Sequence, residues 1–230
     1  MIRMPRHWHR WWSLRPLFRG LARLRRVVGH DAPVREAVEL LGLPREGRVL
    51  DLGCGYGFHL ALLAPEVGEV VAVDTDAERV EAARAAIRDR GFVNVRVLRW
   101  DGVTLPFETG SFDGVLCARS LSAVPDHRRT LDEAVRVLRP GGCLAAADYL
   151  PPTGPWNLLG WLLWPLFLLA GANPNRPLGE DVDRRIPLFA HHVRLGGLFF
   201  VAAGRKPALE EPATPEERQP EASDLVSTGS

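Results

Sequence analysis

The sequence predicts an α/β fold, a doubly wound and mostly parallel sheet with an antiparallel hairpin at its C-terminal end. Between Pro33 and Pro207, short apolar or β-branched runs alternate with stretches of helical character, and strands separated regularly by helices form parallel βαβ units. Two later runs, near 187–193 and 198–204, flank a pair of adjacent glycines and predict the hairpin. Hydrophobic residues make up 46% of the 230 and charged residues 25%, which is the composition of an ordinary globular domain.

Each predicted strand is a short apolar run that ends in turn residues. The strands are expected at 47–52, 69–74, 94–100, 113–118 and 142–149. The helices between them are expected at 58–65, 76–90 and 127–138. In a sheet of this kind the ligand binds at the carboxyl ends of the strands, so side chains at those ends are the candidate site residues.

Charge divides the chain into an arm, a body and a tail. Residues 1–30 hold eight arginines and no acidic residue, whereas residues 207–230 hold six acidic residues and one arginine. The body at 31–206 is close to neutral, so it lacks the broad positive field that favours nucleic acid, and no such partner is expected. The tail has almost no large apolar residues and is predicted to be disordered.

The arm has the pattern of a basic amphipathic helix. From Trp11 to Val28 its apolar residues recur every three or four positions, and arginine is the commonest residue at the others. These arginines interrupt every candidate signal-peptide core, so the arm is expected to stay on the mature protein. Its tryptophans suit a membrane surface rich in anionic lipid. The same apolar stripe also suits packing on the body as a lid, and the pattern does not separate the two alternatives.

The cysteines indicate a reducing compartment. Cys54, Cys117 and Cys143 form an odd, widely spaced set without a Cys-x-x-Cys pair, which argues against a disulfide framework or a zinc cluster. A cytoplasmic protein without a metal site is therefore expected.

A glycine-rich loop follows the first predicted strand directly. Glycines at 53, 55 and 57 permit positive φ and remove Cβ atoms, so backbone amides can approach a small-molecule ligand. The Gly-x-Gly-x-x-Gly pattern of nicotinamide dinucleotide enzymes is not met, because Phe58 or Leu60 occupies the third glycine position. The pattern present is Asp-x-Gly-x-Gly-x-Gly, with Asp51 inside the strand.

This pattern, DLGCGYG at 51–57, resembles the glycine motif of the class I S-adenosylmethionine-dependent methyltransferases, of the type 11 group. Further matches follow in order: the strand end at 70–74 (VVAVD), then 100–102 (WDG), 105–107 (LPF), 111–113 (SFD) and 138–142 (LRPGG). Together these motifs, between about residues 45 and 150, are specific where each alone is weak. The resemblance implies a Rossmann-like fold, S-adenosylmethionine as cofactor and methyl transfer as activity.

The resemblance also assigns the cofactor-binding residues around the methionyl and ribosyl groups. The loop residues Gly53, Cys54, Gly55 and Gly57 would line this part of the cofactor. Asp51 would lie near its ammonium group.

A second set would hold the ribose and adenine. Asp74 would accept hydrogen bonds from the ribose hydroxyls, and Asp101 one from the adenine amino group, with Thr75 and Gly102 flanking the ring. Backbone of Cys117 or Ala118 would lie near the methionyl end. Trp100 departs from the pattern, because relatives usually have glycine there.

Methyl transfer needs placement and exclusion of water, and a dedicated base is optional. Tyr149 and His191 are weak candidates for a catalytic role, and the catalytic residues are otherwise unknown. For Tyr149 and also for Tyr56, ordinary packing of the ring is the favoured interpretation. His191 and His192 should face opposite sides of a strand, so they are not a chelating pair. Serine hydrolysis is disfavoured because no Gly-x-Ser-x-Gly occurs.

An uncharged segment at 155–172 follows the fifth strand and carries three tryptophans. It suits a membrane-interface helix, a lid over an apolar acceptor or a buried core helix. A straight helix through Ala172 would be only about 26 Å long, which is short for a membrane span, and Pro165 would kink it. This stretch loosely resembles bacterial lipid-type methyltransferases. The resulting hypothesis is a cytoplasmic enzyme, peripheral on the inner face of the membrane, that methylates a lipid or quinone. The alternatives are a soluble small-molecule methyltransferase of secondary metabolism and a catalytically silent cofactor-binding module; the oligomeric state is left open.

Overall fold

The computed structural model describes residues 32–150, 173, 175–194 and 199–208. The predicted arm, the segment 155–172 and all but the first two residues of the predicted tail lie outside the described residues.

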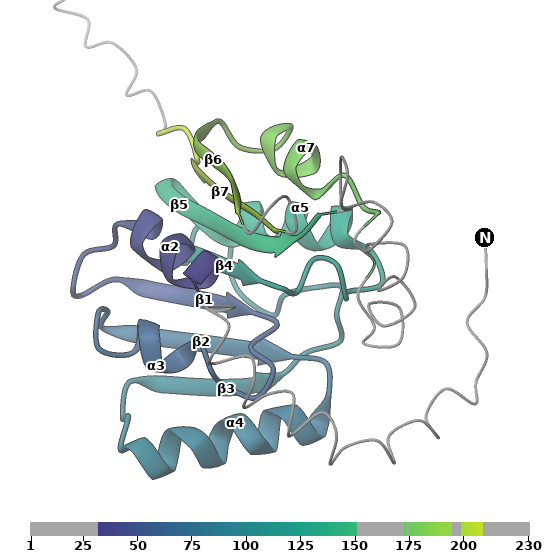
Figure 1. Cartoon of the computed structure of the whole chain (residues 1–230). Helices are drawn as coiled ribbons and strands as arrows, with labels where there is room; N and C mark the ends of the chain where they lie inside the picture. Colours follow the sequence, from purple (N-terminus) through teal and green to yellow (C-terminus); the bar gives the residue numbers. More distant parts are fainter. Residues whose placement is uncertain (1–31, 151–172, 174, 195–198, 209–230) are drawn as a thin grey trace, which may run out of the picture.

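In the described part of the chain, seven strands form one sheet in the order β3-β2-β1-β4-β5-β7-β6 (Figure 1). The parallel strands are β1 (Arg48–Leu52), β2 (Glu69–Asp74), β3 (Val95–Arg99), β4 (Phe112–Ala118) and β5 (Leu138–Tyr149). The remaining two are β6 (Leu188–Arg194) and β7 (Phe199–Arg205), and β7 runs antiparallel to both of its neighbours. The predicted mostly parallel sheet with an antiparallel hairpin is confirmed.

The order of the strands determines where a ligand site can form. The chain moves outward from β1 through β2 to β3 and then returns to place β4 on the other side of β1. The loops after β1 and β4 therefore diverge at the carboxyl edge of the sheet, and this divergence opens a crevice there.

Helices cover both faces of the sheet. The described helices are α2 (Ala32–Leu41), α3 (Leu60–Leu63), α4 (Ala77–Arg90), α5 (His127–Val137) and α7 (Leu178–Asp183). Buried side chains of α2, α3 and α4 share one apolar cluster, and those of α5 and α7 share the other, on the opposite face. Two of these helices, α2 and α7, are absent from the sequence prediction, and α3 is shorter than the predicted helix at 58–65.

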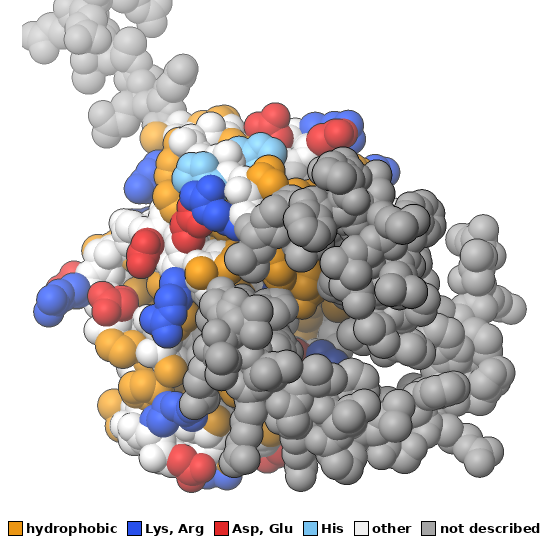
Figure 2. Space-filling view, viewed as in Figure 1, with side chains coloured by type: hydrophobic (Ala, Val, Ile, Leu, Met, Phe, Trp, Pro, Cys, Tyr) orange, Lys and Arg blue, Asp and Glu red, His pale blue; other side chains and the backbone are white. Residues whose placement is uncertain are grey.

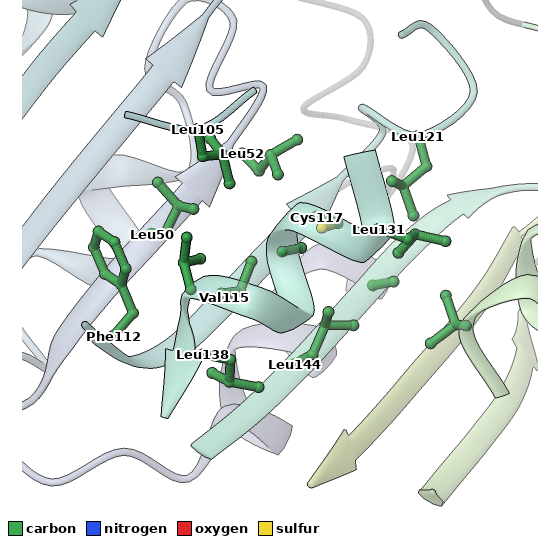
Figure 3. Close-up of a cluster of buried hydrophobic side chains, with 14 of the residues drawn as sticks. Leu50, Leu52, Leu105, Phe112, Val115, Cys117, Leu121, Leu131, Leu138 and Leu144 are labelled. Atoms are coloured by element: carbon green, nitrogen blue, oxygen red, sulfur yellow. The ribbon is translucent and has the colours of Figure 1, made fainter. Parts of the chain in front are cut away.

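The central strands alternate their side chains between the two clusters. In β1, Val49 belongs to the cluster with α2, α3 and α4, whereas Leu50 and Leu52 belong to the cluster with α5 and α7. Figure 3 shows this second cluster, in which Leu50 and Leu52 lie with Val115 of β4 and Leu144 of β5. Because both faces are covered, most of the buried positions of these strands are apolar.

Helix α4 is bounded by residues that the sequence makes recognisable. The Asp76 side chain accepts hydrogen bonds from the backbone amides of Glu78 and Arg79 at the N-terminus. Gly91, with φ of 71°, ends the helix in the left-handed conformation. This cap fixes the start of α4 directly beyond the end of β2, beside the crevice.

Candidate functional site

The glycine loop turns sharply after β1, and its glycines are required for different reasons. Gly53 has φ of 85°, and a Cβ atom there would lie 2.4 Å from the Cβ of Ser120. Gly57 has φ of 77°, and its Cβ would lie 3.2 Å from Ala83 of α4. Gly55 also has positive φ, but nothing lies within 4 Å of its Cβ position. The loop thus packs tightly at both ends and is open in the middle.

Asp74 at the end of β2 anchors this loop. The amide of Gly55 donates to its Oδ2 at 2.8 Å, and the amide of Asp76 donates to its Oδ1 at 3.0 Å. The side chain is almost fully buried, yet each carboxylate oxygen retains a second acceptor direction. Asp74 can therefore accept two further hydroxyl hydrogens while it fixes the loop.

A cavity of about 210 Å³ lies at the crevice beyond β1, β2 and β4. Its lining residues are Gly53, Asp74, Thr75, Asp76, Arg79, Trp100, Arg119, Ser120, Ala123, Val124 and Pro125. Three predicted site residues, Gly53, Asp74 and Thr75, line it. Trp100 also lines it, and its indole Nε1 donates to the carbonyl of Thr104 at 3.0 Å, so the unusual tryptophan forms part of the wall.

Asp51 lies fully buried beneath the loop, and neither of its carboxylate oxygens has a hydrogen-bond partner among the described residues. Burial, with a smaller contribution from the charge of Asp74, raises the pKa of Asp51 to about 7, and the charge of Arg119 opposes this shift. A buried carboxylate without a donor is costly unless a cation or donor reaches it. The site therefore fits a ligand that brings a positively charged group to Asp51.

Arg119 follows β4 and lines the cavity. Among the described residues it is the one non-glycine residue with positive φ, 55°. Its Nη2 lies 2.8 Å from Nε2 of His59, the residue that precedes α3. Strained backbone of this kind is often retained at functional sites, and here it directs a guanidinium group toward the cavity wall.

Other predicted cofactor residues do not line the cavity with their side chains. Cys117 is fully buried in the cluster shown in Figure 3, near Leu121 and Leu131. Cys54 is also buried, and burial raises the pKa of both thiols well above its ordinary value. Both side chains are therefore uncharged packing groups, and only their backbone can face a ligand.

Asp101 is exposed on the turn after β3, and it caps that turn. Its Oδ1 accepts hydrogen bonds from the amides of Val103 at 2.8 Å and Thr104 at 3.0 Å. Gly102, with φ of 86°, lies against Thr75, because a Cβ atom at Gly102 would lie 3.0 Å from the Thr75 methyl group. The proposed contact of Asp101 with adenine stays a prediction.

The weak catalytic candidates do not line the cavity. Tyr149 is partly buried, with its ring centroid 4.8 Å from that of Phe199. His191 is exposed and lies near Phe200, whereas His192 contacts Glu36 of α2 on the other face of the sheet, so the two histidines face opposite sides as expected. Figure 2 shows histidine side chains gathered over the β6 end of the sheet. Catalytic roles for Tyr149 and His191 stay predictions.

The described residues contain no group of three or more histidine, cysteine, aspartate or glutamate side chains arranged to hold a metal ion. Within the same residues, no helix combines the length and apolar character needed to cross a membrane.

Similar solved structures share the fold. An S-adenosylmethionine-dependent methyltransferase from Aquifex aeolicus superimposes with a TM-score of 0.55 and 26% identity, over 75% of this chain and 88% of that one. The [4+2]-cyclase SpnF superimposes with a TM-score of 0.67 and 18% identity, over 77% and 81% of the two chains, which is a likeness of fold alone.

Residues 50–146 match the family described as a methyltransferase domain. The match spans less than half of the chain, and it supports the resemblance to the class I S-adenosylmethionine-dependent methyltransferases. The cofactor that these comparisons support is S-adenosylmethionine. The matched range covers β1 to most of β5, which includes every strand end at the cavity.

Curated relatives within the family are partial matches. A demethylmenaquinone methyltransferase of Listeria welshimeri is 32% identical over 130 residues, 55% of this chain and 53% of the relative. The protein of that name in Lactococcus lactis is 36% identical over 110 residues, 46% and 44% of the two chains. An uncharacterized methyltransferase of Bacillus subtilis, YcgJ, is 34% identical over 110 residues, 48% and 44%. The chain spans about half the length of the curated relatives it matches.

Proposed function

We propose that this chain transfers the methyl group of S-adenosylmethionine to a small acceptor. The observation that carries the proposal is a cavity lined by Gly53 and Asp74, with the donor-free Asp51 buried two residues before that glycine. The bound cofactor supplies a methyl group already activated by a positively charged sulfur. The protein then has to bind, orient and exclude water.

The residues of the crevice divide this work. Asp74 would accept hydrogen bonds from the sugar hydroxyls, and Asp51 would balance the ammonium group. Trp100 and the residues after β4 close the walls of the cavity, which limits the access of water. No histidine, tyrosine, cysteine or lysine lines the described cavity, so the proposal suits an acceptor that needs no dedicated protein base.

The acceptor that we propose is apolar and of the quinone or lipid type. Tyr56 and Phe58, on and directly after the glycine loop, are about half exposed, at 48% and 47% of the residue surface, and their ring centroids lie 6.4 Å apart. Two exposed aromatic rings at the edge of a cofactor crevice suit an apolar substrate. Relatives named demethylmenaquinone methyltransferase support the same class.

Peripheral contact with the membrane is part of this proposal. It rests on the sequence, in which the arginine- and tryptophan-rich arm and the uncharged segment 155–172 suit an anionic membrane surface. Flotation of the full-length protein with anionic vesicles at low salt tests it. Recovery of the protein with the vesicles is expected, and protein that stays at the bottom of the gradient would contradict membrane contact.

A second candidate function is binding of the cofactor without methyl transfer. The observation that favours it is the lack of an evident acid or base, other than carboxylates, among the described lining residues. The fold alone does not decide, since one structure with a similar fold is named as a [4+2]-cyclase.

The decisive experiment combines binding and turnover on the full-length protein. Calorimetry with S-adenosylhomocysteine measures binding, and release of S-adenosylhomocysteine from S-adenosylmethionine measures turnover with reduced quinone precursors, phenols and lipid amines as acceptors. Turnover with the quinone precursors is expected. Binding without turnover on any acceptor class would favour the silent module, and absence of binding would overturn both functions.

A further inference from the structure

One wall of the cavity is a short turn after β4, residues 120–125. Ser120, Ala123, Val124 and Pro125 of this turn line the cavity. Within the turn, the amides of Ala123 and Val124 both donate to the carbonyl of Ser120, each at 3.0 Å. These bonds close the turn but leave its later carbonyl groups to find partners elsewhere.

The partners come from a segment some fifty residues further along the chain. Nη1 of Arg176 donates to the carbonyl of Leu121 at 2.7 Å and to that of Val124 at 2.6 Å. Its Nη2 donates to the carbonyl of Pro125 at 3.4 Å. The backbone amide of Asn173 donates to the carbonyl of Ser122 at 2.9 Å. Four carbonyls of the wall are thus held by Asn173 and Arg176.

Arginine suits this task because its planar guanidinium group presents several donors at fixed angles and keeps its charge. Burial lowers the pKa of Arg176, and the charges of Asp148 at the end of β5 and Asp126 at the start of α5 oppose this shift. Asp148 is fully buried, and its Oδ2 accepts a hydrogen bond from the amide of Ser122 at 3.0 Å. Ser122 is therefore held through its amide by Asp148 and through its carbonyl by Asn173.

The position of this wall decides the width of the cofactor crevice. Its first residue, Ser120, packs against Gly53 so closely that a Cβ atom on Gly53 would lie 2.4 Å away. Its last residue, Pro125, faces Gly102 on the turn after β3. The turn therefore spans the crevice from the glycine loop to the end of β3, and a shift of the turn would alter both ends of the cavity.

We propose that Arg176 is a positioning residue for the cofactor pocket, which acts through the wall at 120–125 and does not itself line the cavity. The proposal deepens the proposed function and rests on it. Arg176 also stands shortly after the uncharged segment 155–172 in the sequence. Its hydrogen bonds therefore connect the wall at 120–125 to the part of the chain that follows this segment.

The test compares Arg176→Ala and Arg176→Lys with the control Arg184→Ala in the full-length protein. Arg184 is an arginine of the same region, but it is 61% exposed and its side chain pairs only with Glu180 and Asp181 of α7 among the described residues. Calorimetry with S-adenosylhomocysteine gives the affinity, and circular dichroism confirms that each variant is folded at the temperature of measurement.

Arg176→Ala is expected to weaken binding by about tenfold or more, because it removes the three charge-assisted hydrogen bonds from Arg176 to the wall. Arg176→Lys should recover part of that loss, because a lysine ammonium can still donate to one or two carbonyls. Arg184→Ala should bind as the wild type does. In turnover, the KM for S-adenosylmethionine should rise more than kcat falls.

A purely structural role would lower the melting temperature and leave the affinity of the folded fraction unchanged. Should Arg176→Ala fail to fold, Arg176→Lys carries the test, and wild-type affinity and KM in that folded variant would overturn the proposal. If the wild type itself does not bind S-adenosylhomocysteine, the proposed function fails and this inference fails with it. If the wild type binds and both folded Arg176 variants bind as tightly as the wild type, only the inference fails.

Discussion

The two sides of the cofactor crevice are built in different ways. On one side, the glycine loop and the end of β2 are held by contacts within residues 51–76, chiefly the bonds from the amides of Gly55 and Asp76 to Asp74. On the other side, the turn at 120–125 is held by distant residues, Asp148, Asn173 and Arg176. The first side is encoded in a compact motif, whereas the second depends on the completed tertiary structure.

This difference implies different responses to mutation. On the motif side, one added methyl group or one lost carboxylate should have a large effect on stability or on ligand affinity, because the local geometry leaves no room for change. On the tertiary side, a single substitution should have a smaller effect, because several residues hold the turn at 120–125 and each substitution removes only some of its hydrogen bonds.

The largest effect is expected for Gly53→Ala. A Cβ at this position would lie 2.4 Å from the Cβ of Ser120, and φ is 85°, so both packing and backbone are strained. We expect the free energy of unfolding to fall by about 3 kcal/mol or more. Gly55→Ala is the matched control: it has positive φ but open space and should cost about 1 kcal/mol. Equal losses in urea unfolding of the two variants would show that contact across the crevice is unimportant.

Asp74→Ala should reduce affinity for S-adenosylhomocysteine by about 10- to 100-fold, the scale of a lost pair of charge-assisted hydrogen bonds. The matched comparison is Asp101→Ala, the next carboxylate along the strand ends, which caps its own turn. Calorimetry on both variants separates the roles that the family resemblance assigns. Wild-type affinity in Asp74→Ala would refute the assignment of the sugar to this side chain.

Asp51 predicts a pH dependence whose sign follows from its raised pKa. Between the ordinary carboxyl pKa near 4 and the folded value of about 7, the folded protein holds a proton that the unfolded chain has released. The free energy of unfolding contributed by this group therefore falls as pH rises through that window. Asp51→Asn removes this cost, so it should stabilise the ligand-free protein by about 1–3 kcal/mol at pH 8 and by less at about pH 5.

Ionisation of Asp51 should also affect ligand binding, and here the affinity should rise with pH, whereas the stability of the ligand-free protein falls. Since the ammonium group of the cofactor favours ionised Asp51, affinity for S-adenosylmethionine should rise from about pH 6 to about pH 8 in the wild type. Calorimetry across this range gives the comparison. An Asp51→Asn variant that shows the same rise would mean that another group titrates.

The smallest effects are expected for Tyr149→Phe and His191→Ala. Neither residue lines the cavity, and both rings lie near phenylalanines of β7. The value of kcat, measured by S-adenosylhomocysteine release, should change by less than about threefold in each variant. A loss of about 100-fold or more in Tyr149→Phe would instead identify the tyrosine as a catalytic group.

Much of the fold is predictable from the sequence because its signals are local. The apolar runs predict the ends of β1 and β2 to within one residue. Asp76 caps the N-terminus of α4, and Gly91 ends the helix at its C-terminus. The helices α2 and α7 are not predicted, since each is short and is stabilised by contacts far along the chain. Asp181 of α7, for example, is held by His127 and Arg128 of α5.

The site divides along the same line. Gly53, Asp74 and Thr75 are predicted because they belong to motifs that directly follow strands. Arg119, the turn after it and Arg176 are not predicted, because their positions depend on hydrogen bonds between residues some fifty or more apart in sequence. The one local signal would have been position alone, since Arg119 is the first residue after β4.

A crystal structure of the full-length protein with S-adenosylhomocysteine tests the central claim most directly. The expected result is a ligand in the crevice beyond β1, β2 and β4, with its ribose hydroxyls within hydrogen-bond distance of the Asp74 carboxylate and its ammonium group facing Asp51. A ligand bound elsewhere, or a crevice filled by the protein's own side chains, would contradict it.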